Sequence, residues 1–179
     1  MKIILIGIQG SGKSTQGNLL SEKLGLPYLS TGHIFRDLAK EHTPLGRQIK
    51  VVMNVGLLIS DAKTLKIVSE YLSRPEYQNG YILDGFPRTL GQVKAFKNGI
   101  DKVIYLKITD KEALWRISGR DGEIREDETL MAVRKRIDSF HKFTEPVLEH
   151  YKKKGNLVEV VGEQPIDKIH KEIMQKIKK

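Results

Sequence analysis

A glycine-rich segment near the start of the chain has the residue types and spacing of a phosphate-binding loop. The segment GIQGSGKS (7–14) fits the pattern G-x-x-x-x-G-K-[ST]. Its glycines allow backbone N–H groups to turn inward around phosphate oxygens, and the helix expected after the loop directs its positive end at the same place. Lys13 adds a full positive charge for the β- and γ-phosphates. The residues that we expect to bind ATP here are Gly10, Ser11, Gly12, Lys13, Ser14 and Thr15, with the hydroxyl of Ser14 or Thr15 also near Mg²⁺.

A second phosphate-binding segment is predicted in NGYILDGFPRT (79–89). Asp84 ends an apolar, buried strand, where an unpaired carboxylate is costly. The carboxyl end of a parallel strand suits a carboxylate that binds Mg²⁺, partly through water. The alternative is that Asp84 only caps the following turn. The GFPR turn then presents Arg88 to the site.

Two more segments place arginines on helices. In LSTGHIFR (29–36), Arg36 lies one turn into the helix that follows a strand. In TDKEALWRISGR (109–120), Arg116 and Arg120 are four residues apart, so they share a helix face and repel each other when exposed. A phosphate between the two guanidinium groups turns this repulsion into attraction. A solvated pair on a basic surface is the alternative.

Composition narrows the class of protein. The chain has 179 residues, which suits one domain, and it has no cysteine, which excludes a disulfide scaffold, a thiol nucleophile and a cysteine zinc site. The apolar stretch 3–8 is too short for a secretion signal, and no apolar segment approaches the length of a membrane span, so we expect a cytoplasmic protein. The net charge of +9 fits either a nucleic-acid surface or an anion pocket with lysine-rich helix faces, and we favour the second interpretation.

The pattern of apolar residues predicts a doubly wound α/β fold. Short apolar runs without alternation are typical of parallel strands buried on both faces, and stretches with helical periodicity lie between them. The strands are expected at 3–8, 81–83, 103–106 and 157–161, and the helices at 13–24, 61–72, 109–120, 129–154 (broken near Pro146) and 165–178. We predict one domain over 1–179, with inserted segments at 30–60 and 120–129.

With these motifs in view, the chain resembles the adenylate kinase group of nucleoside monophosphate kinases. The resemblance implies reversible phosphoryl transfer from MgATP to AMP, giving two ADP. It also implies a P-loop NTPase-like, three-layer sandwich whose five-stranded parallel sheet carries a helical monophosphate-binding insert (30–60) and a short lid (120–129). A lid of this composition and length predicts no zinc, and the family habit predicts a monomer. The motifs that carry the resemblance are GIQGSGKSTQ, LSTGHIFR, GLLISD, LDGFPRTLGQ, WRISGR and RKRI, in the order of the family.

The resemblance also assigns roles to individual residues. The catalytic group is Lys13, Arg88, Arg120, Arg125 and Arg136, and the ATP site gains Arg116 and Arg120. The AMP site is Thr31, Arg36, Gly85, Arg88, Gln92, Arg125 and Arg136. Many arginines and no nucleophile–base pair suit phosphoryl transfer, in which positioning and positive charge do most of the work.

The base of the monophosphate is expected to be adenine. In the resembling family, Thr31 and Gln92 accompany adenine, whose N1 and N6 edge a carboxamide matches with one donor and one acceptor. Helix capping is the alternative for both: Ser30 or Thr31 at one helix, and Thr89 with Gln92 as a capping box at another. A kinase for UMP or CMP and a nucleotide-gated RNA- or ribosome-associated factor are the rival functions.

Three positions depart from the family pattern. His33 stands where adenylate kinases usually carry Asp, and Ser14 replaces a frequent Gly. LMAV (130–133) lengthens the stretch before the RKR motif, and this departure bears on the roles of Arg125, Arg134 and Arg136.

Overall fold

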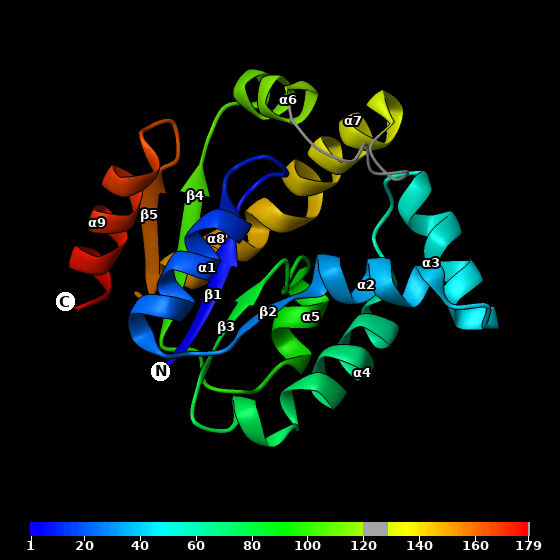
Figure 1. Cartoon of the computed structure of the whole chain (residues 1–179), viewed down its shortest axis with the longest axis horizontal. Helices are drawn as coiled ribbons and strands as arrows, with labels where there is room; N and C mark the ends of the chain where they lie inside the picture. Colours follow the sequence, from blue (N-terminus) through cyan, green and yellow to red (C-terminus); the bar gives the residue numbers. More distant parts are fainter. Residues whose placement is uncertain (120–128, 179) are drawn as a thin grey trace.

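A parallel β-sheet forms the centre of the molecule (Figure 1). The structure is a computed structural model that describes residues 1–119 and 129–178. Within these residues the sheet has five strands, and every neighbouring pair is parallel, which confirms the predicted fold class. In sheet order the strands are β2 (Tyr28–Ser30), β3 (Tyr81–Asp84), β1 (Lys2–Ile6), β4 (Lys102–Lys107) and β5 (Leu157–Val161).

Helices cover both faces of the sheet, because successive side chains of a strand point to opposite faces. Ile3 and Leu5 of β1 pack with Leu20 of α1 (Lys13–Leu24) and Ile173 of α9 (Ile166–Ile177). Ile4 and Ile6 belong to the other apolar cluster, which the remaining helices build. These helices are α4 (Asp61–Leu72), α5 (Leu90–Ala95), α6 (Asp110–Ser118), α7 (Leu130–Ser139) and α8 (Glu145–Lys153). The result is the expected three-layer sandwich.

Two helices extend from the carboxyl end of β2 (Figure 1). They are α2 (Thr31–Lys40) and α3 (Pro44–Asn54), and both fall within the segment 30–60 that we expect to bind the monophosphate. Ile34 and Ile49 are buried and connect this pair of helices to the apolar cluster of Ile4. A short 3₁₀ helix, η1 (Pro75–Tyr77), precedes β3.

The helical stretch predicted over 129–154 is interrupted, as expected, just before Pro146. A π-helical segment, η2 (Phe140–Thr144), separates α7 from α8, and Pro146, which has no N–H to donate to the preceding turn, lies in the first turn of α8. Such π-turns are often found at functional sites.

Two expectations about strands are corrected. The strand predicted at 3–8 ends at Ile6, because Gly7 and Ile8 already belong to the glycine-rich loop. The strand at 157–161 is not buried throughout: it is the edge strand β5, where Val160 is buried and Val161 is exposed.

Candidate active site

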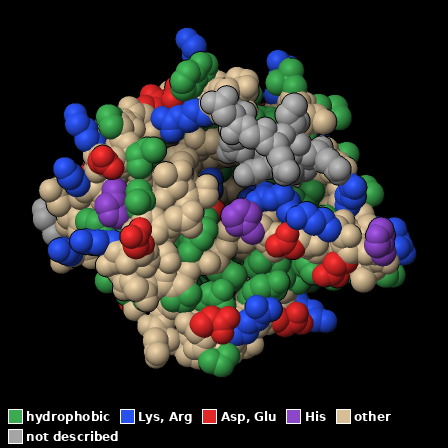
Figure 2. All heavy atoms as spheres, viewed as in Figure 1, with side chains coloured by type: hydrophobic (Ala, Val, Ile, Leu, Met, Phe, Trp, Pro, Cys, Tyr) green, Lys and Arg blue, Asp and Glu red, His purple; other side chains and the backbone are tan. Residues whose placement is uncertain are grey.

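A cavity of about 560 Å³ opens at the carboxyl ends of β1, β2 and β3, where open α/β sheets bind their ligands. Figure 2 shows the hollow in this face of the molecule, with Lys or Arg and His side chains at its margin. The parallel register places Leu5 and Ser30 beside Asp84, so these strands end at one level. The predicted site residues that line the cavity are Gly10, Ser11, Gly12, Lys13, Ser14, Thr15, Arg36, Asp84, Gly85, Arg88, Gln92, Arg116 and Arg136.

The glycine-rich loop has the backbone conformation of an anion-binding turn. Gly10 and Gly12 have φ of 88° and 90°, a region that residues with a Cβ rarely adopt. The Lys13 ammonium lies inside the curl of the loop, where Nζ donates to the carbonyl oxygens of Gly7 at 2.8 Å and Ile8 at 3.0 Å. Gly12 caps α1 without a side chain, so the first N–H groups of the helix can face an anion.

Asp84 is a buried carboxylate at the end of β3, with 7 % of its surface exposed. Its Oδ2 accepts hydrogen bonds from the Tyr28 hydroxyl at 2.8 Å and, weakly, from Ser30 Oγ at 3.5 Å. Its Oδ1 has no hydrogen-bond partner among the described residues. A buried oxygen of this kind is costly unless a donor or cation approaches it. The donor set of Asp84 with the P-loop hydroxyl groups is therefore suited to Mg²⁺, a cation that prefers oxygen ligands and keeps some water.

Tyr28 is tied to this carboxylate. Burial, together with the negative charge of Asp84, raises the pKa of Tyr28 well above its usual range, so the phenol keeps its proton and remains a donor. The ring packs against α1 at Gly17, where a Cβ would lie 2.4 Å from the ring. The position of Tyr28 therefore depends on a glycine in the helix that follows the P-loop.

Arg88 is held in a fixed orientation at the floor of the cavity. Its Nε donates to the Gly85 carbonyl at 2.8 Å, and its own carbonyl accepts from the Thr144 hydroxyl of η2 at 3.1 Å. Burial lowers the pKa of Arg88, and the nearby charges of Arg36 and Arg136 add to this effect, whereas Asp84 opposes it. A guanidinium stays protonated in a protein, so the site concentrates positive charge that a bound anion would relieve.

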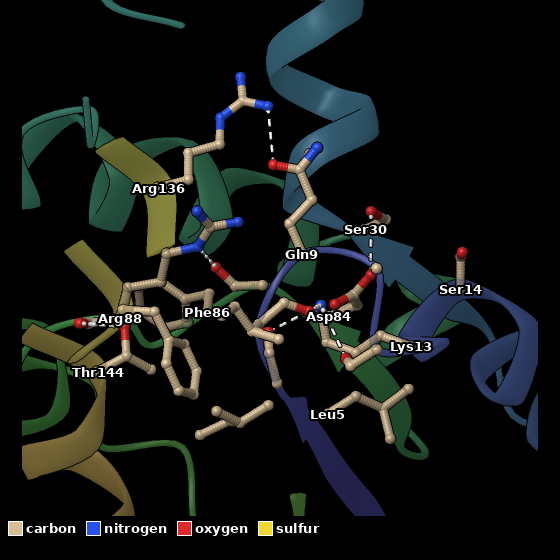
Figure 3. Close-up of a pocket in the computed structure, with 18 of the residues that line it drawn as sticks. Leu5, Gln9, Lys13, Ser14, Ser30, Asp84, Phe86, Arg88, Arg136 and Thr144 are labelled. Carbon is tan, nitrogen blue, oxygen red and sulfur yellow. Dashed lines mark hydrogen bonds between the residues drawn. The ribbon is translucent and has the colours of Figure 1, made fainter. Parts of the chain in front are cut away.

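Arg136 connects two parts of the site. One terminal nitrogen donates to Gln9 Oε1 of the P-loop at 3.1 Å, and the other donates to the Met53 carbonyl of α3 at 3.1 Å. Figure 3 shows Arg136 and Arg88 on one side of the cavity, with Lys13 and Asp84 across from them. Arg136 thus joins the loop that is expected to hold ATP to α3, and both guanidinium groups line the same cavity as Lys13.

Of the three other arginines predicted at the ATP site or the lid, the structure describes only Arg116. Arg116 lines the cavity, but its Nε is bound to Glu112 at 2.6 Å and a terminal nitrogen donates to the Gly162 carbonyl at 2.9 Å. Thr109 caps α6 by accepting from the Glu112 N–H, and the side chain of Glu112 pairs with Arg116. Arg120 and Arg125, with most of the predicted lid, lie outside the described residues.

The capping interpretation of Thr31 is wrong. Thr31 is the first residue of α2, and its buried hydroxyl donates to the Asp84 carbonyl at 3.0 Å, linking β2 to β3. Ser30, at the cap position, makes no capping hydrogen bond with its side chain. Gly85 adjoins Thr31 with φ of 79°, and a Cβ there would lie 2.6 Å from the Thr31 hydroxyl oxygen. The close approach explains why glycine follows Asp84.

The capping interpretation of Gln92 is confirmed only in part. Thr89 Oγ1 accepts from the Gln92 backbone N–H at 3.1 Å and caps α5. The carboxamide of Gln92 does not return this bond to Thr89; its Oε1 accepts from the Arg88 N–H at 2.7 Å, and its Nε2 donates to Asp61 Oδ1 at 2.9 Å. Gln92 is 2 % exposed and lines the cavity.

Comparison with known proteins identifies the family over most of the chain. The family model described as adenylate kinase matches residues 5–156. The chain belongs to the adenylate kinase family. The chain is 38 % identical over 185 residues to an adenylate kinase of Pseudarthrobacter chlorophenolicus, an alignment that covers 99 % of this chain and 96 % of the relative. It is 35 % identical over 210 residues to one of Caldicellulosiruptor saccharolyticus, covering 98 % of each chain.

Membership of the adenylate kinase family confirms the predicted enzyme class, a nucleotide-binding phosphotransferase, and the family generally uses MgATP. The rival interpretations, a pyrimidine nucleotide kinase and an RNA- or ribosome-associated factor, are not favoured. In the part of the chain that the structure describes, no helix is long and apolar enough to cross a membrane. The same residues contain no group of three or more His, Cys, Asp or Glu side chains arranged to hold a metal ion.

Several residues of the adenylate kinase site were not predicted from the sequence. Gln9 occupies a variable position of the P-loop pattern, and Tyr28 precedes the motif that drew attention to β2. Asp61 lies in GLLISD, a motif that we used for the resemblance without giving Asp61 a role. No sequence motif marks Thr144. Its hydroxyl reaches the Arg88 carbonyl from the end of the π-helical segment η2, a contact that depends on the folded structure.

Proposed function

We propose that this chain transfers the γ-phosphoryl group of MgATP to AMP reversibly, through residues that line one cavity. The observation that carries this assignment is the shared cavity itself: its lining includes the P-loop with Lys13 together with Arg36, Arg88 and Arg136. Two anionic tails that enter from opposite ends therefore meet between fixed positive charges. Phosphoryl transfer needs little more from a protein than this positioning and charge.

On the ATP side, the P-loop N–H groups and Lys13 bind the β- and γ-phosphates. The geometry that supports this role is the inward-turned loop around the Lys13 ammonium. Arg116 stands at the margin of the same cavity, bound to Glu112, and it contributes to the triphosphate site by exchanging this partner for a phosphate. Arg120 completes the pair in the proposed lid.

Mg²⁺ would be held by Asp84, partly through water, and by the hydroxyl of Ser14 or Thr15. Asp84 Oδ1, which has no hydrogen-bond partner in the part of the chain that the structure describes, supports this assignment, as does the exposure of Ser14 and Thr15 in the first turn of α1. When bound, the ion would neutralise negative charge on the phosphates. Tyr28 and Ser30 hold the Asp84 carboxylate in place by hydrogen bonds to its other oxygen, Oδ2.

On the AMP side, Arg36 and Arg88 bind the phosphate, and Arg136, with Arg125, attends the group in transfer. The Nε bond to Gly85 fixes the plane of the Arg88 guanidinium, and its terminal nitrogens suit a bidentate contact with phosphate. Gly85 lines the wall of the cavity, and Gln92 recognises adenine by its carboxamide. Thr31 does not line the cavity; its buried hydroxyl supports this wall by donating to the Asp84 carbonyl. His33, exposed on α2, replaces the usual acidic residue there.

Residues 120–129 form a short lid that excludes water during transfer. The ends of α6 at Ser118 and α7 at Leu130 leave only a short connection for it. The 210-position alignment with the Caldicellulosiruptor relative is longer than this chain, which agrees with a shortened segment. We also propose that the chain works as a monomer in the cytoplasm and needs no zinc; gel filtration at assay concentrations tests the first point.

The assay for this function measures ADP formed from ATP and AMP by Lys13→Ala and Arg88→Ala variants. Loss of one guanidinium or ammonium that contacts the transferring group costs about 10²–10³-fold in kcat. Arg74→Ala is the matched control, because Arg74 stacks on the Tyr71 ring at 4.0 Å and does not line the cavity. Circular dichroism establishes that each variant is folded.

The proposal is refuted if a Lys13→Ala or Arg88→Ala variant is folded and turns over as fast as the Arg74→Ala control. A substrate panel of AMP, GMP, CMP, UMP and dTMP tests the base, and preference for a pyrimidine would refute the role of Gln92.

A further inference from the structure

Asp61 is the acceptor that fixes the carboxamide of Gln92. It lies in the first turn of α4, and its two carboxylate oxygens accept from different partners, one in α5 and one at the N-cap of α5. Oδ1 accepts from Gln92 Nε2 at 2.9 Å, and Oδ2 accepts from the Thr89 hydroxyl at 2.8 Å. Thr89 in turn accepts from the Gln92 backbone N–H at 3.1 Å. The side chain and the backbone of Gln92 are thus both connected to one carboxylate.

The chemistry of these partners determines which way the Gln92 carboxamide points. An ionised carboxylate only accepts hydrogen bonds, so the nitrogen of the carboxamide must face Asp61. The backbone N–H of Arg88 only donates, so the oxygen must face Arg88, and this bond is 2.7 Å long. A rotation of the carboxamide by half a turn would place donor against donor and acceptor against acceptor.

This fixed direction matters for the base. A carboxamide nitrogen has two hydrogens and its oxygen has two lone pairs, so the contacts with Asp61 and Arg88 leave one donor and one acceptor for a ligand. A 6-aminopurine offers a donor at N6 and an acceptor at N1. A 6-oxopurine offers the reverse, an acceptor at O6 and a donor at N1. Only a reversed carboxamide matches the second pattern.

We infer that Asp61 is a positioning residue for substrate specificity: by holding the Gln92 carboxamide in one orientation, it makes the monophosphate site select 6-aminopurine over 6-oxopurine nucleotides. This inference rests on the proposed function, in which Gln92 recognises the base. Asp61 itself need not touch the substrate. Its effect is to remove the orientation of Gln92 in which IMP or GMP would be accepted.

Gly91 provides a second, independent way to disturb Asp61. A Cβ at Gly91 would lie 2.5 Å from Asp61 Oδ2, closer than atoms can approach, so the carboxylate must move away. Gly91 is exposed and lies inside α5, and no left-handed φ is required of it, so alanine suits the backbone there. Gly91→Ala therefore displaces Asp61 without removing any polar group.

The experiment measures kcat and KM for AMP and for IMP, which differ in the amino or oxo group at position 6 and in the hydrogen that the oxo form carries at N1. The variants are Asp61→Asn, Gly91→Ala and Gln92→Leu, with Asp167→Asn as the matched control, since Asp167 is an exposed carboxylate in the first turn of α9. Asparagine keeps the shape of Asp61 but presents either oxygen or nitrogen to Gln92, so it no longer imposes an orientation.

We expect the ratio of kcat/KM for AMP to that for IMP to fall about tenfold in Asp61→Asn. This fold-change corresponds to the contribution of one hydrogen bond to a charged group. Gly91→Ala should change this ratio in the same direction, through a higher KM for AMP with kcat for IMP retained. Asp167→Asn should leave the ratio unchanged. A purely structural role for Asp61 predicts a parallel loss with both substrates, and that result overturns the inference.

The Gln92→Leu variant distinguishes recognition of the base by Gln92 from orientation of Gln92 by Asp61. If its ratio falls while the ratios of Asp61→Asn and Gly91→Ala equal that of Asp167→Asn, Gln92 recognises the base but Asp61 does not orient it, and only the inference is refuted. If Gln92→Leu keeps the AMP preference of the parent chain, recognition of adenine by Gln92 is refuted, and the inference with it.

Discussion

Replacement of Tyr28 by phenylalanine tests how the buried carboxylate of Asp84 is held. Phenylalanine keeps the ring that packs against Gly17 and removes only the hydroxyl that donates to Asp84 Oδ2 at 2.8 Å. Asp84 then keeps the weak contact with Ser30 at 3.5 Å, while its Oδ1 already lacks a hydrogen-bond partner among the described residues. The substitution therefore leaves a carboxylate that is 7 % exposed with little hydrogen bonding.

The magnitude follows from the kind of bond that is lost. A hydrogen bond to a charged group contributes about 1.5–3 kcal/mol, and the donor here keeps its proton because the pKa of Tyr28 is raised by burial and by Asp84. For a chain of this size each kcal/mol changes Tm by about 2–4 °C, so we expect a decrease between about 3 and 12 °C.

Thermal unfolding followed by circular dichroism measures this change. Tyr71→Phe is the control, because the Tyr71 ring lies under the Arg74 guanidinium and keeps that contact without its hydroxyl. The reasoning is refuted if Tyr28→Phe and Tyr71→Phe unfold at the same temperature as the parent chain.

Two further predictions concern packing and pH. Gly17→Ala places a Cβ 2.4 Å from the Tyr28 ring, so urea unfolding should show a loss of about 1–3 kcal/mol; an unchanged midpoint would mean that the ring moves aside easily. His141 has its pKa raised above 6.5 by its hydrogen bond to Glu145 and by Asp110, so its stabilising effect is present below pH 6.5 and is lost as the pH rises through the folded-state value. His141→Gln should therefore lower Tm at about pH 5 and have little effect at about pH 9, and an equal decrease at both values would contradict this assignment.

Four of the five strands that the structure describes, and the exact bounds of two helices, could be predicted from local signals. Helix α1 was expected at 13–24 and is observed there, because glycines stand at both ends: Gly12 at the N-cap and Gly25, with φ of 64°, at the C-cap. The helix expected at 61–72 is also observed without change. Helix α1 is thus defined by the glycines at its ends, whereas α4 is defined by its stripe of apolar residues, of which Ile67, Val68 and Leu72 are buried.

The side-chain partners within the site could not be predicted in this way. Gln92 and Asp61 are 31 residues apart, and Arg136 and Gln9 are 127 apart, so the folded arrangement of the sheet decides which groups meet. Capping motifs illustrate the same limit. The local half of the Thr89 motif formed, but the carboxamide of Gln92 found better partners in three dimensions.

The carbonyl contacts of Lys13 have a consequence for the rate and strength of nucleotide binding. Gly7 and Ile8 already hold the ammonium at 2.8 and 3.0 Å, and the glycines of the turn already have their unusual dihedral angles. The entropy lost in curling this stretch of backbone is thus spent when the protein folds and not when a nucleotide arrives. Incoming phosphates therefore meet a loop that is preorganised, and ordering of this loop takes nothing from the affinity for the nucleotide.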